Sequence, residues 1–186
     1  MKKIFIDCGA NNGCSIDLFL KKYPKSNEFE IHSFEPNPKF SKSFDKYGGN
    51  VTLHKNVVFT QNVTIDFYLG RDLSSSIRKD KITGINYKNV PIKVDAIDLS
   101  EFIKNNFNIQ DYIVLKMDIE GAEYDVLPHL INEGIFDGWV DEIFGEWHLG
   151  KLTTITKEQH FNIIKLLNSK GFKMKEWNVD TKIIEL

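Results

Sequence analysis

Apolar positions recur along the first part of the chain with two different spacings. An apolar run at residues 4–6 and the β-prone segments 29–34 and 51–58 predict three strands. Between these segments, residues 15–23 carry apolar positions at helical spacing, and Pro38 favours the start of a second helix at 39–47. The resulting β-α-β-α-β order is typical of a parallel, doubly wound α/β sheet.

A different pattern follows the third predicted strand. Apolar and polar positions alternate with period two in residues 63–69 and 90–97, which predicts an inserted antiparallel β-hairpin. The polar stretch 74–88 lies between these two runs. We expect this connection to be long and mobile, and to serve either as a substrate lid or as a solvated loop.

The remaining chain returns to alternating helices and strands. The predicted elements are a helix at 101–106 capped by Asp98 or Ser100, a buried strand at 112–118, a helix at 123–132, a strand at 140–147, an amphipathic helix at 156–169, and a last hairpin of residues 172–177 and 182–186. Glu123 is interpreted as a helix N-terminal carboxylate rather than a catalyst. No repeat or linker divides the sequence, so we expect residues 1–186 to form a single domain, which could itself belong to a longer protein.

Composition and charge narrow the class of function. The chain is 41% hydrophobic and 27% charged, as ordinary globular domains are, and its net charge of -2 gives no electrostatic basis for binding nucleic acid. Asp7 interrupts the first apolar run, and no later run approaches the ~20 apolar residues of a membrane span. Cys8 and Cys14 are too few for a disulfide framework, so we expect reduced thiols and a cytoplasmic location.

A glycine loop joins the first predicted strand to the first predicted helix. Residues 7–13 read DCGANNG, and such a loop leaves backbone N–H groups and a helix N-terminus available to an anion or a polar ligand. The loop lacks the middle glycine of the dinucleotide fingerprint G-x-G-x-x-G, and Asp7 would repel a pyrophosphate. A carboxylate at this place suits an ammonium or a sulfonium, which favours S-adenosylmethionine over NAD as the cofactor.

Glu35, directly after the second predicted strand, supports a nucleoside-containing cofactor. An acidic residue at this place can accept hydrogen bonds from both ribose hydroxyls. Ligands of open parallel sheets bind beyond the carboxyl ends of the strands, where the third strand brings Asn56 and Val57. The predicted cofactor-binding residues are Asp7, Gly9, Ala10, Asn11, Asn12, Gly13, Glu35, Pro36, Asn56 and Val57.

Charged residues also gather at the carboxyl ends of the strands predicted at 112–118 and 140–147. Side chains alternate along a strand, so Lys116, Asp118 and, if the chain stays extended, Glu120 share one face. Glu146 and His148 likewise share one face of the other strand. Neighbouring strands would then present three carboxylates, a lysine and an imidazole to one cleft, where these groups would shift one another's pKa values.

Four segments resemble the FkbM family of S-adenosylmethionine-dependent methyltransferases. The segments are DCGANNG at 7–13, FEPNP at 34–38, LKMDIEGAEYDVL at 115–127 and EIFGEWH at 142–148. This resemblance implies a class I methyltransferase fold, which is a Rossmann-like, doubly wound sheet of about seven strands with an antiparallel last strand that the final hairpin would supply. It also implies an O-methyltransferase that acts on a hydroxyl of a sugar in a glycan or glycoconjugate.

The resemblance further implies an in-line displacement in which an acceptor oxygen attacks the sulfonium methyl group. An alcohol is weakly acidic, so a base or a metal ion should assist the loss of its proton. We predict Asp118 and His148 as the proton-handling pair, and Glu146 as an orienting or substrate-binding residue. Lys116 would stabilise the oxyanion or neutralise the carboxylates, and Glu120 completes the predicted catalytic set. Mg²⁺ or Mn²⁺ held by Asp118 and Glu146 is the alternative to a base, and the sequence leaves this choice open.

Other functions remain open beside sugar O-methylation. The acceptor could instead be a hydroxyl of a non-sugar natural product. A module that binds S-adenosylmethionine without catalysis would not need the acidic and imidazole groups at the ends of the two strands, and a nicotinamide oxidoreductase is disfavoured by the glycine loop. We expect a sugar or glycan acceptor as partner, with glycosyltransferases as fused or cooperating proteins, and the sequence does not indicate an oligomeric state.

Overall fold

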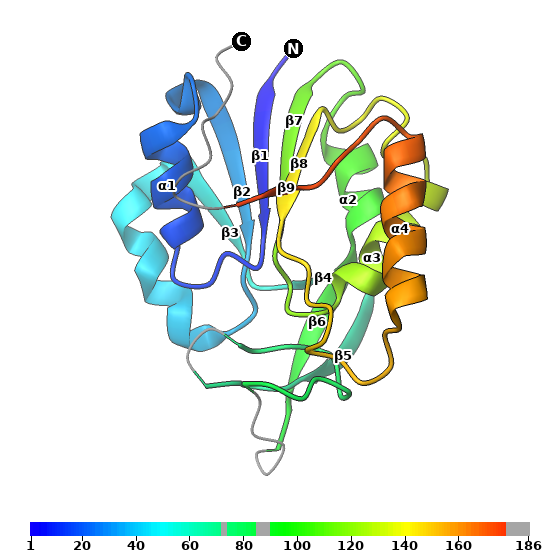
Figure 1. Cartoon of the computed structure of the whole chain (residues 1–186). Coiled ribbons are helices and arrows are strands. Elements are labelled where there is room, and N and C mark those ends of the chain that lie inside the picture. Colours follow the sequence, from blue (N-terminus) through cyan, green and yellow to red (C-terminus); the bar gives the residue numbers. More distant parts are fainter. Residues whose placement is uncertain (72–73, 85–89, 178–186) are drawn as a thin grey trace.

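The computed structural model describes residues 1–71, 74–84 and 90–177, with a six-stranded sheet at the centre (Figure 1). The strands of this sheet are β1 (Lys3–Cys8), β2 (Phe29–Phe34), β3 (Val51–His54), β7 (Tyr112–Met117), β8 (Glu142–Gly145) and β9 (Lys175–Glu176). Their order is β3-β2-β1-β7-β8-β9, and every neighbouring pair runs parallel. The predicted α/β class with a Rossmann-like sheet is therefore confirmed.

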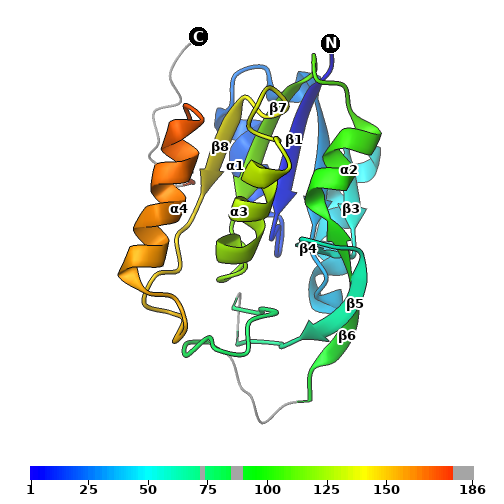
Figure 2. The same cartoon turned by 90° about the vertical axis from the view of Figure 1, so that its right-hand side faces the viewer.

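Helices cover both faces of the sheet, which explains why its central strands are apolar almost throughout. On one side lie α1 (Cys14–Lys22) and the 3₁₀ helix η2 (Pro38–Asn50), with the short 3₁₀ turn η1 (Ser26–Glu28) before β2. On the other side lie α2 (Leu99–Asn106), α3 (Glu123–Asn132) and α4 (Lys157–Ser169), as Figures 1 and 2 show. None of the described helices is long and apolar enough to cross a bilayer.

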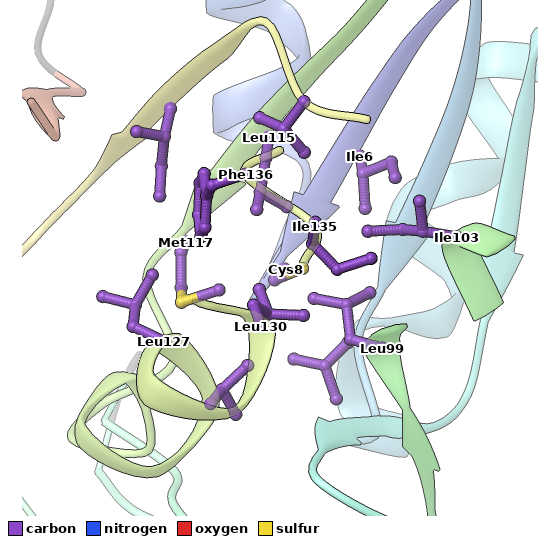
Figure 3. Packing of buried hydrophobic residues seen from close by; sticks show 14 of the residues in the cluster. Ile6, Cys8, Leu99, Ile103, Leu115, Met117, Leu127, Leu130, Ile135 and Phe136 are labelled. Carbon is purple, nitrogen blue, oxygen red and sulfur yellow. The ribbon is translucent and has the colours of Figure 1, made fainter. Parts of the chain in front are cut away.

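Alternate residues of β1 enter two different cores. Ile4 and Ile6 belong to a buried cluster that includes Leu99 of α2 and Leu127 of α3. Figure 3 shows part of this cluster, in which side chains of β1 and β7 meet those of α2 and α3. Phe5 points the other way and stacks on Phe19 of α1, with ring centroids 4.0 Å apart. The central strands are thus fixed from both sides, and their carboxyl ends form a firm base for a site.

A second sheet follows β3 in the chain. Its strands are β4 (Val57–Phe59), β5 (Val63–Phe67) and β6 (Ile92–Asp98), in the order β4-β6-β5. β5 and β6 form the predicted antiparallel hairpin, and β4 adds a parallel neighbour to β6. The single strand predicted at 51–58 is wrong, because the chain leaves the main sheet after His54. The Asn56 side chain then donates to the carbonyl oxygen of Asp95 in the second sheet (3.3 Å), which turns the chain into β4.

Two other predicted elements differ from the structure. The helix expected at 39–47 is the 3₁₀ helix η2, which begins at a proline and contains the non-helical Gly48. Residues 172–177 supply the short strand β9, which runs parallel to β8 because the α4 crossover returns the chain to the same end of the sheet. The antiparallel seventh strand expected at 182–186 lies outside the described residues, so the described sheet has six strands.

Residues 74–84 pass across the carboxyl ends of the main sheet (Figure 1). Ser76 forms an antiparallel bridge with Tyr68, and Lys81 forms one with Leu152 in the loop after β8. The Arg78 guanidinium is paired with Asp125 in α3 at 2.6 Å. The described part of the predicted polar stretch is therefore bonded to Tyr68 after β5, to α3 and to the loop after β8. The mobility expected of the whole stretch stays a prediction.

Candidate active site

A cavity of about 400 Å³ opens at the carboxyl ends of β1, β2 and β7 and reaches the second sheet. The chain runs outward from β1 to β3 and returns to β7 on the other side of β1, so the cavity lies at the switch point of the sheet, where such folds bind ligands. The predicted cofactor-binding residues that line it are Gly9, Ala10, Asn11, Asn12, Glu35, Pro36, Asn56 and Val57. The other two, Asp7 and Gly13, are not among the described lining residues.

Glu35 is held at the edge of this cavity by the backbone. One carboxylate oxygen accepts the N–H of Asn11 at 2.9 Å, and the other accepts the N–H of Asn37 at 2.7 Å. Each oxygen keeps a second lone pair, so the carboxylate can still accept bonds from two hydroxyl groups. Burial raises the pKa of Glu35 to about 7, although the backbone bonds oppose this shift. The bonds also fix the glycine loop to the end of β2.

Two glycines allow the end of β7 to lie against its neighbours. Gly9 has φ +80°, and a Cβ atom there would lie 2.0 Å from the carbonyl oxygen of Asp118. At Gly145 on β8, a Cβ atom would lie 2.1 Å from the carbonyl oxygen of Met117. Neither contact is possible for a larger residue without a backbone shift. The backbone that carries Asp118 is thus enclosed from both sides.

Asp7 has a different place from the one its position in the loop predicts. Its side chain is fully buried, and its carboxylate lies 3.1 Å from the ammonium of Lys116, its register partner on β7. Lys116 also donates to the carbonyl oxygen of Gly9 at 3.0 Å. Burial alone would lower the pKa of Lys116, but the charges of Asp7 and Asp118 raise it above its usual value. Of the two roles predicted for Lys116, this geometry favours neutralisation of carboxylates.

Asp118, Glu120 and His148 converge as predicted, although the chain does not stay extended. β7 ends at Met117, and Glu120 adopts a left-handed conformation with φ +56°, which is uncommon for a residue other than glycine. The Nε2 atom of His148 lies 3.7 Å from Asp118 Oδ1 and 3.4 Å from Glu120 Oε2. Asp118 and Glu120 also line the cavity. The carboxylates that follow β7 therefore face the same cavity as the glycine loop.

Glu123 orients this imidazole, a role that its position at the start of α3 did not reveal. Its carboxylate accepts from His148 Nδ1 at 2.8 Å and from the His148 backbone N–H at 3.0 Å, and both side chains are fully buried. Its second oxygen accepts the N–H of Gly121 at 2.9 Å. Burial would lower the pKa of His148, but the bond and charge of Glu123 raise it above its usual value. Because Nδ1 bonds Glu123, Nε2 is the ring atom that faces the carboxylates of Asp118 and Glu120.

Lys81 is a second residue that sequence reasoning missed. It lies in the polar stretch, yet only 1% of it is exposed, and its ammonium pairs with the Glu120 carboxylate. It also donates to the carbonyl oxygen of Ser74 at 2.9 Å. In the sequence, Lys81 is one of several polar residues with no periodic pattern, so no local signal distinguishes it.

Glu146 lines the cavity but stands apart from the convergent group. Its side chain is 57% exposed, lies 3.9 Å from His148 Nε2, and pairs with Lys151 at 3.0 Å. The described residues that could hold a metal ion together are Asp118, Glu120 and His148, whose ligand atoms all lie within 4.8 Å of one another. Of the pair that the sequence predicts for a divalent ion, Asp118 belongs to this group and Glu146 lies outside it, and a bound metal ion stays a prediction.

The cavity fits an adenosine-bearing cofactor. Its volume falls within the range of small-molecule sites, roughly 300–1,000 Å³. Glu35 has acceptors to spare for ribose hydroxyls, and Val57 and Phe67 offer apolar walls to a base. The glycine loop brings its backbone to the same space. Asp7, by contrast, pairs with Lys116 and is not among the described residues that line the cavity.

Comparisons with known proteins agree with this geometry. Residues 7–174 match the family described as "Methyltransferase FkbM domain". A curated protein named Methyltransferase 1, from Beauveria bassiana (strain ARSEF 2860), is 29% identical over an alignment 193 residues long that covers 90% of this chain and 71% of that protein. No solved structure gave a significant match. S-adenosylmethionine is the usual cofactor that such a family implies. The match spans the cofactor loop, the acidic cluster and both strands that carry it, and the chain therefore belongs to the FkbM methyltransferase family.

Proposed function

We propose that the protein is an O-methyltransferase whose acceptor is a hydroxyl group of a sugar. The observation that carries the proposal is the presence of Asp118 and Glu146 on the wall of the cavity that the cofactor loop also lines. A site for transfer to an alcohol needs a proton acceptor close to the methyl donor. A module that only binds the cofactor would have no use for these carboxylates.

Asp118 is the residue that we propose as the proton acceptor. Its side chain is 34% exposed, whereas His148 is fully buried behind it. S-adenosylmethionine supplies a methyl group on a sulfonium: the new O–CH₃ bond forms as the C–S bond breaks, and the sulfur leaves as a neutral thioether. The hydroxyl proton passes to Asp118. The carbonyl oxygen of Asp118 lies against the glycine loop at Gly9, which keeps its carboxylate in place relative to the cofactor site.

Several polar groups that line the same cavity as Asp118 support a polyhydroxylated acceptor. Glu146, Asn12 and Ser75 line the cavity, and each can bond a hydroxyl group. Ionised carboxylates are strong acceptors for hydroxyl donors, so Asp118 and Glu146 together suit two hydroxyls of one ring. An acceptor with a single hydroxyl would leave one of these groups without a partner, which lowers affinity.

Incubation of the protein with methyl-labelled S-adenosylmethionine and a panel of oligosaccharides tests this proposal. We expect label in at least one sugar, and the Asp118→Asn variant should transfer it roughly 10²–10⁴-fold more slowly because the proton acceptor is lost. Asp137→Asn is the matched control, since Asp137 is an exposed carboxylate that pairs with Lys170 and is not among the described residues that line the cavity. Binding of the cofactor with no label in any sugar, or full turnover by Asp118→Asn, would contradict the proposal.

A further inference from the structure

We propose that Asp118, Glu120 and His148 bind a divalent cation of the Mn²⁺ class. The binding of the cation does not depend on the proposed function, but a role of the cation in methyl transfer rests on it. Metal–ligand bonds of about 2.1 Å place ligand atoms roughly 3.0–4.3 Å apart around one ion. His148 Nε2 lies 3.4 Å from Glu120 Oε2 and 3.7 Å from Asp118 Oδ1, inside this range.

The buried imidazole gives independent support for a ligand at this place. Neither the side chain of His148 nor its Nε2 atom is exposed to solvent, and within residues 1–71, 74–84 and 90–177 no group forms a hydrogen bond with Nε2. A buried polar atom without a partner costs about 1–3 kcal/mol. Because Glu123 fixes the ring through Nδ1, Nε2 cannot turn away from the two carboxylates. A cation between the three groups would satisfy it.

Each of the three proposed ligands contacts a second, buried charged side chain: a carboxylate for the imidazole, and an ammonium for each carboxylate. Glu123 holds His148 at 2.8 Å. Lys81, at the inner side of the segment 74–84, pairs with Glu120, and Lys116 lies 3.6 Å from Asp118. A carboxylate behind a ligating histidine is the usual arrangement in metal sites, because it sets the tautomer and the direction of the ring. The three ligands are therefore oriented before an ion arrives.

The charges around His148 leave an excess that a divalent ion would balance. The carboxylates facing the ring are those of Asp118, Glu120, Glu123 and Glu146. A fifth carboxylate, that of Asp7, shares the Lys116 ammonium with Asp118. The cations paired with these five carboxylates are Lys81, Lys116 and Lys151. With a neutral imidazole, two negative charges remain. Mn²⁺ cancels them, and the partly buried position of the cluster makes this cancellation count more than it would in water.

The donor set favours Mn²⁺ over Mg²⁺. Two carboxylate oxygens suit either ion, but an imidazole nitrogen suits transition metals better than Mg²⁺. Asp118 and Glu120 line the cavity, so an ion between them would keep open positions on that side. A hydroxyl group bound there would lose its proton more easily, and that proton would pass to Asp118. The metal and the base, which the sequence presents as alternatives, would then act together.

Titration of the protein with Mn²⁺, followed by electron paramagnetic resonance of the free ion, tests the site without any turnover. We expect one Mn²⁺ per chain and an increase in the thermal unfolding temperature of the wild-type protein. Glu120→Gln should weaken Mn²⁺ binding at least 10-fold, and Glu123→Gln should weaken it roughly 10–100-fold because the imidazole loses its orienting partner. Glu133→Gln, an exposed carboxylate paired with Lys104, is the matched control and should bind as the wild type does.

Three outcomes would overturn the metal site. These are the absence of Mn²⁺ binding below about 1 mM, equal binding by Glu120→Gln and the wild type, and competition by Mg²⁺ as strong as that of Mn²⁺ itself. The labelled-cofactor assay with and without chelator separates this proposal from the proposed function. Mn²⁺ binding without methyl transfer would keep the site and refute the reaction. Methyl transfer that is unaffected by chelator, together with no Mn²⁺ binding, would keep the reaction and refute the site.

Discussion

Replacing Lys116 with methionine should reveal how strongly the site depends on one buried charge. Asp7 is fully buried and Lys116 is 2% exposed, with 3.1 Å between their charged atoms. Lys116→Met keeps an unbranched side chain but removes the ammonium, which leaves the Asp7 carboxylate without a counter-charge. Removing one partner of a buried ion pair typically lowers the free energy of unfolding by about 3–5 kcal/mol. We expect Lys116→Met to fall in this range.

The double variant shows whether the loss comes from the unpaired charge. Asp7→Asn together with Lys116→Met removes both charges, so most of the lost stability should return, with a coupling energy of about 2 kcal/mol or more. Asp7→Asn alone should be milder than Lys116→Met, because Lys116 keeps Asp118 at 3.6 Å and the Gly9 carbonyl at 3.0 Å. If Lys116→Met does not fold at all, recovery of folding in the double variant is the readout.

Urea unfolding followed by circular dichroism at pH 7.5 measures these free energies. The folded-state pKa of Lys116 is raised, so its contribution is complete below the unfolded value and is lost only as the pH rises through the folded value, well above 7.5. Lys104→Met is the control, since its exposed pair with Glu133 should contribute less than about 1 kcal/mol. Two results would refute this account. One is a free energy of unfolding of Lys116→Met within about 1 kcal/mol of the wild-type value, and the other is a double variant no more stable than Lys116→Met.

Three further predictions concern the cofactor site and the fold. Adenosine, which does not titrate near neutrality, should bind about ten-fold more tightly at pH 8 than at pH 6, because Glu35 with its pKa of about 7 accepts two hydroxyls only when ionised; calorimetry should show no such dependence in Glu35→Gln. Gly9→Ala should weaken adenosine binding and lower the unfolding temperature, since its Cβ would overlap the Asp118 carbonyl; an unchanged affinity would contradict this. Thr156→Ala should lower the free energy of unfolding by about 1 kcal/mol in urea, because it removes the capping box of α4, without changing adenosine affinity.

The parts of the site that could be predicted from the sequence lie at the ends of strands. The loop at 7–13 and the acidic residues after β7 were found because parallel strands bring their carboxyl ends to one edge, whatever their exact neighbours. Glu35 followed from the same rule. These predictions need only local pattern and strand direction, which explains why most of the predicted cofactor residues line one cavity.

The partners of those residues could not be predicted, because they depend on register and on contacts distant in sequence. Asp7 has the residue type of a ligand for a positive group, but its pairing with Lys116 follows from the alignment of β1 with β7. Glu123 reaches His148 across 25 positions of the sequence, and Lys81 reaches Glu120 across 39. Single-sequence periodicity carries no information on such pairs. The division of the strand predicted at 51–58 depends in the same way on the distant second sheet.

The two glycines beside β7 have a consequence for how this scaffold can change its acceptor. Gly9 and Gly145 enclose the backbone at Met117 and Asp118, so sideways movement of the strand end would press its own carbonyl oxygens against the glycine backbone on either flank. We therefore expect variation in acceptor choice to fall in the segment 74–84 and in the loop after β8, which meet at Lys81 and Leu152. Exchange of these two loops as a pair, with β7 and its glycine neighbours untouched, is the rational route to a new substrate.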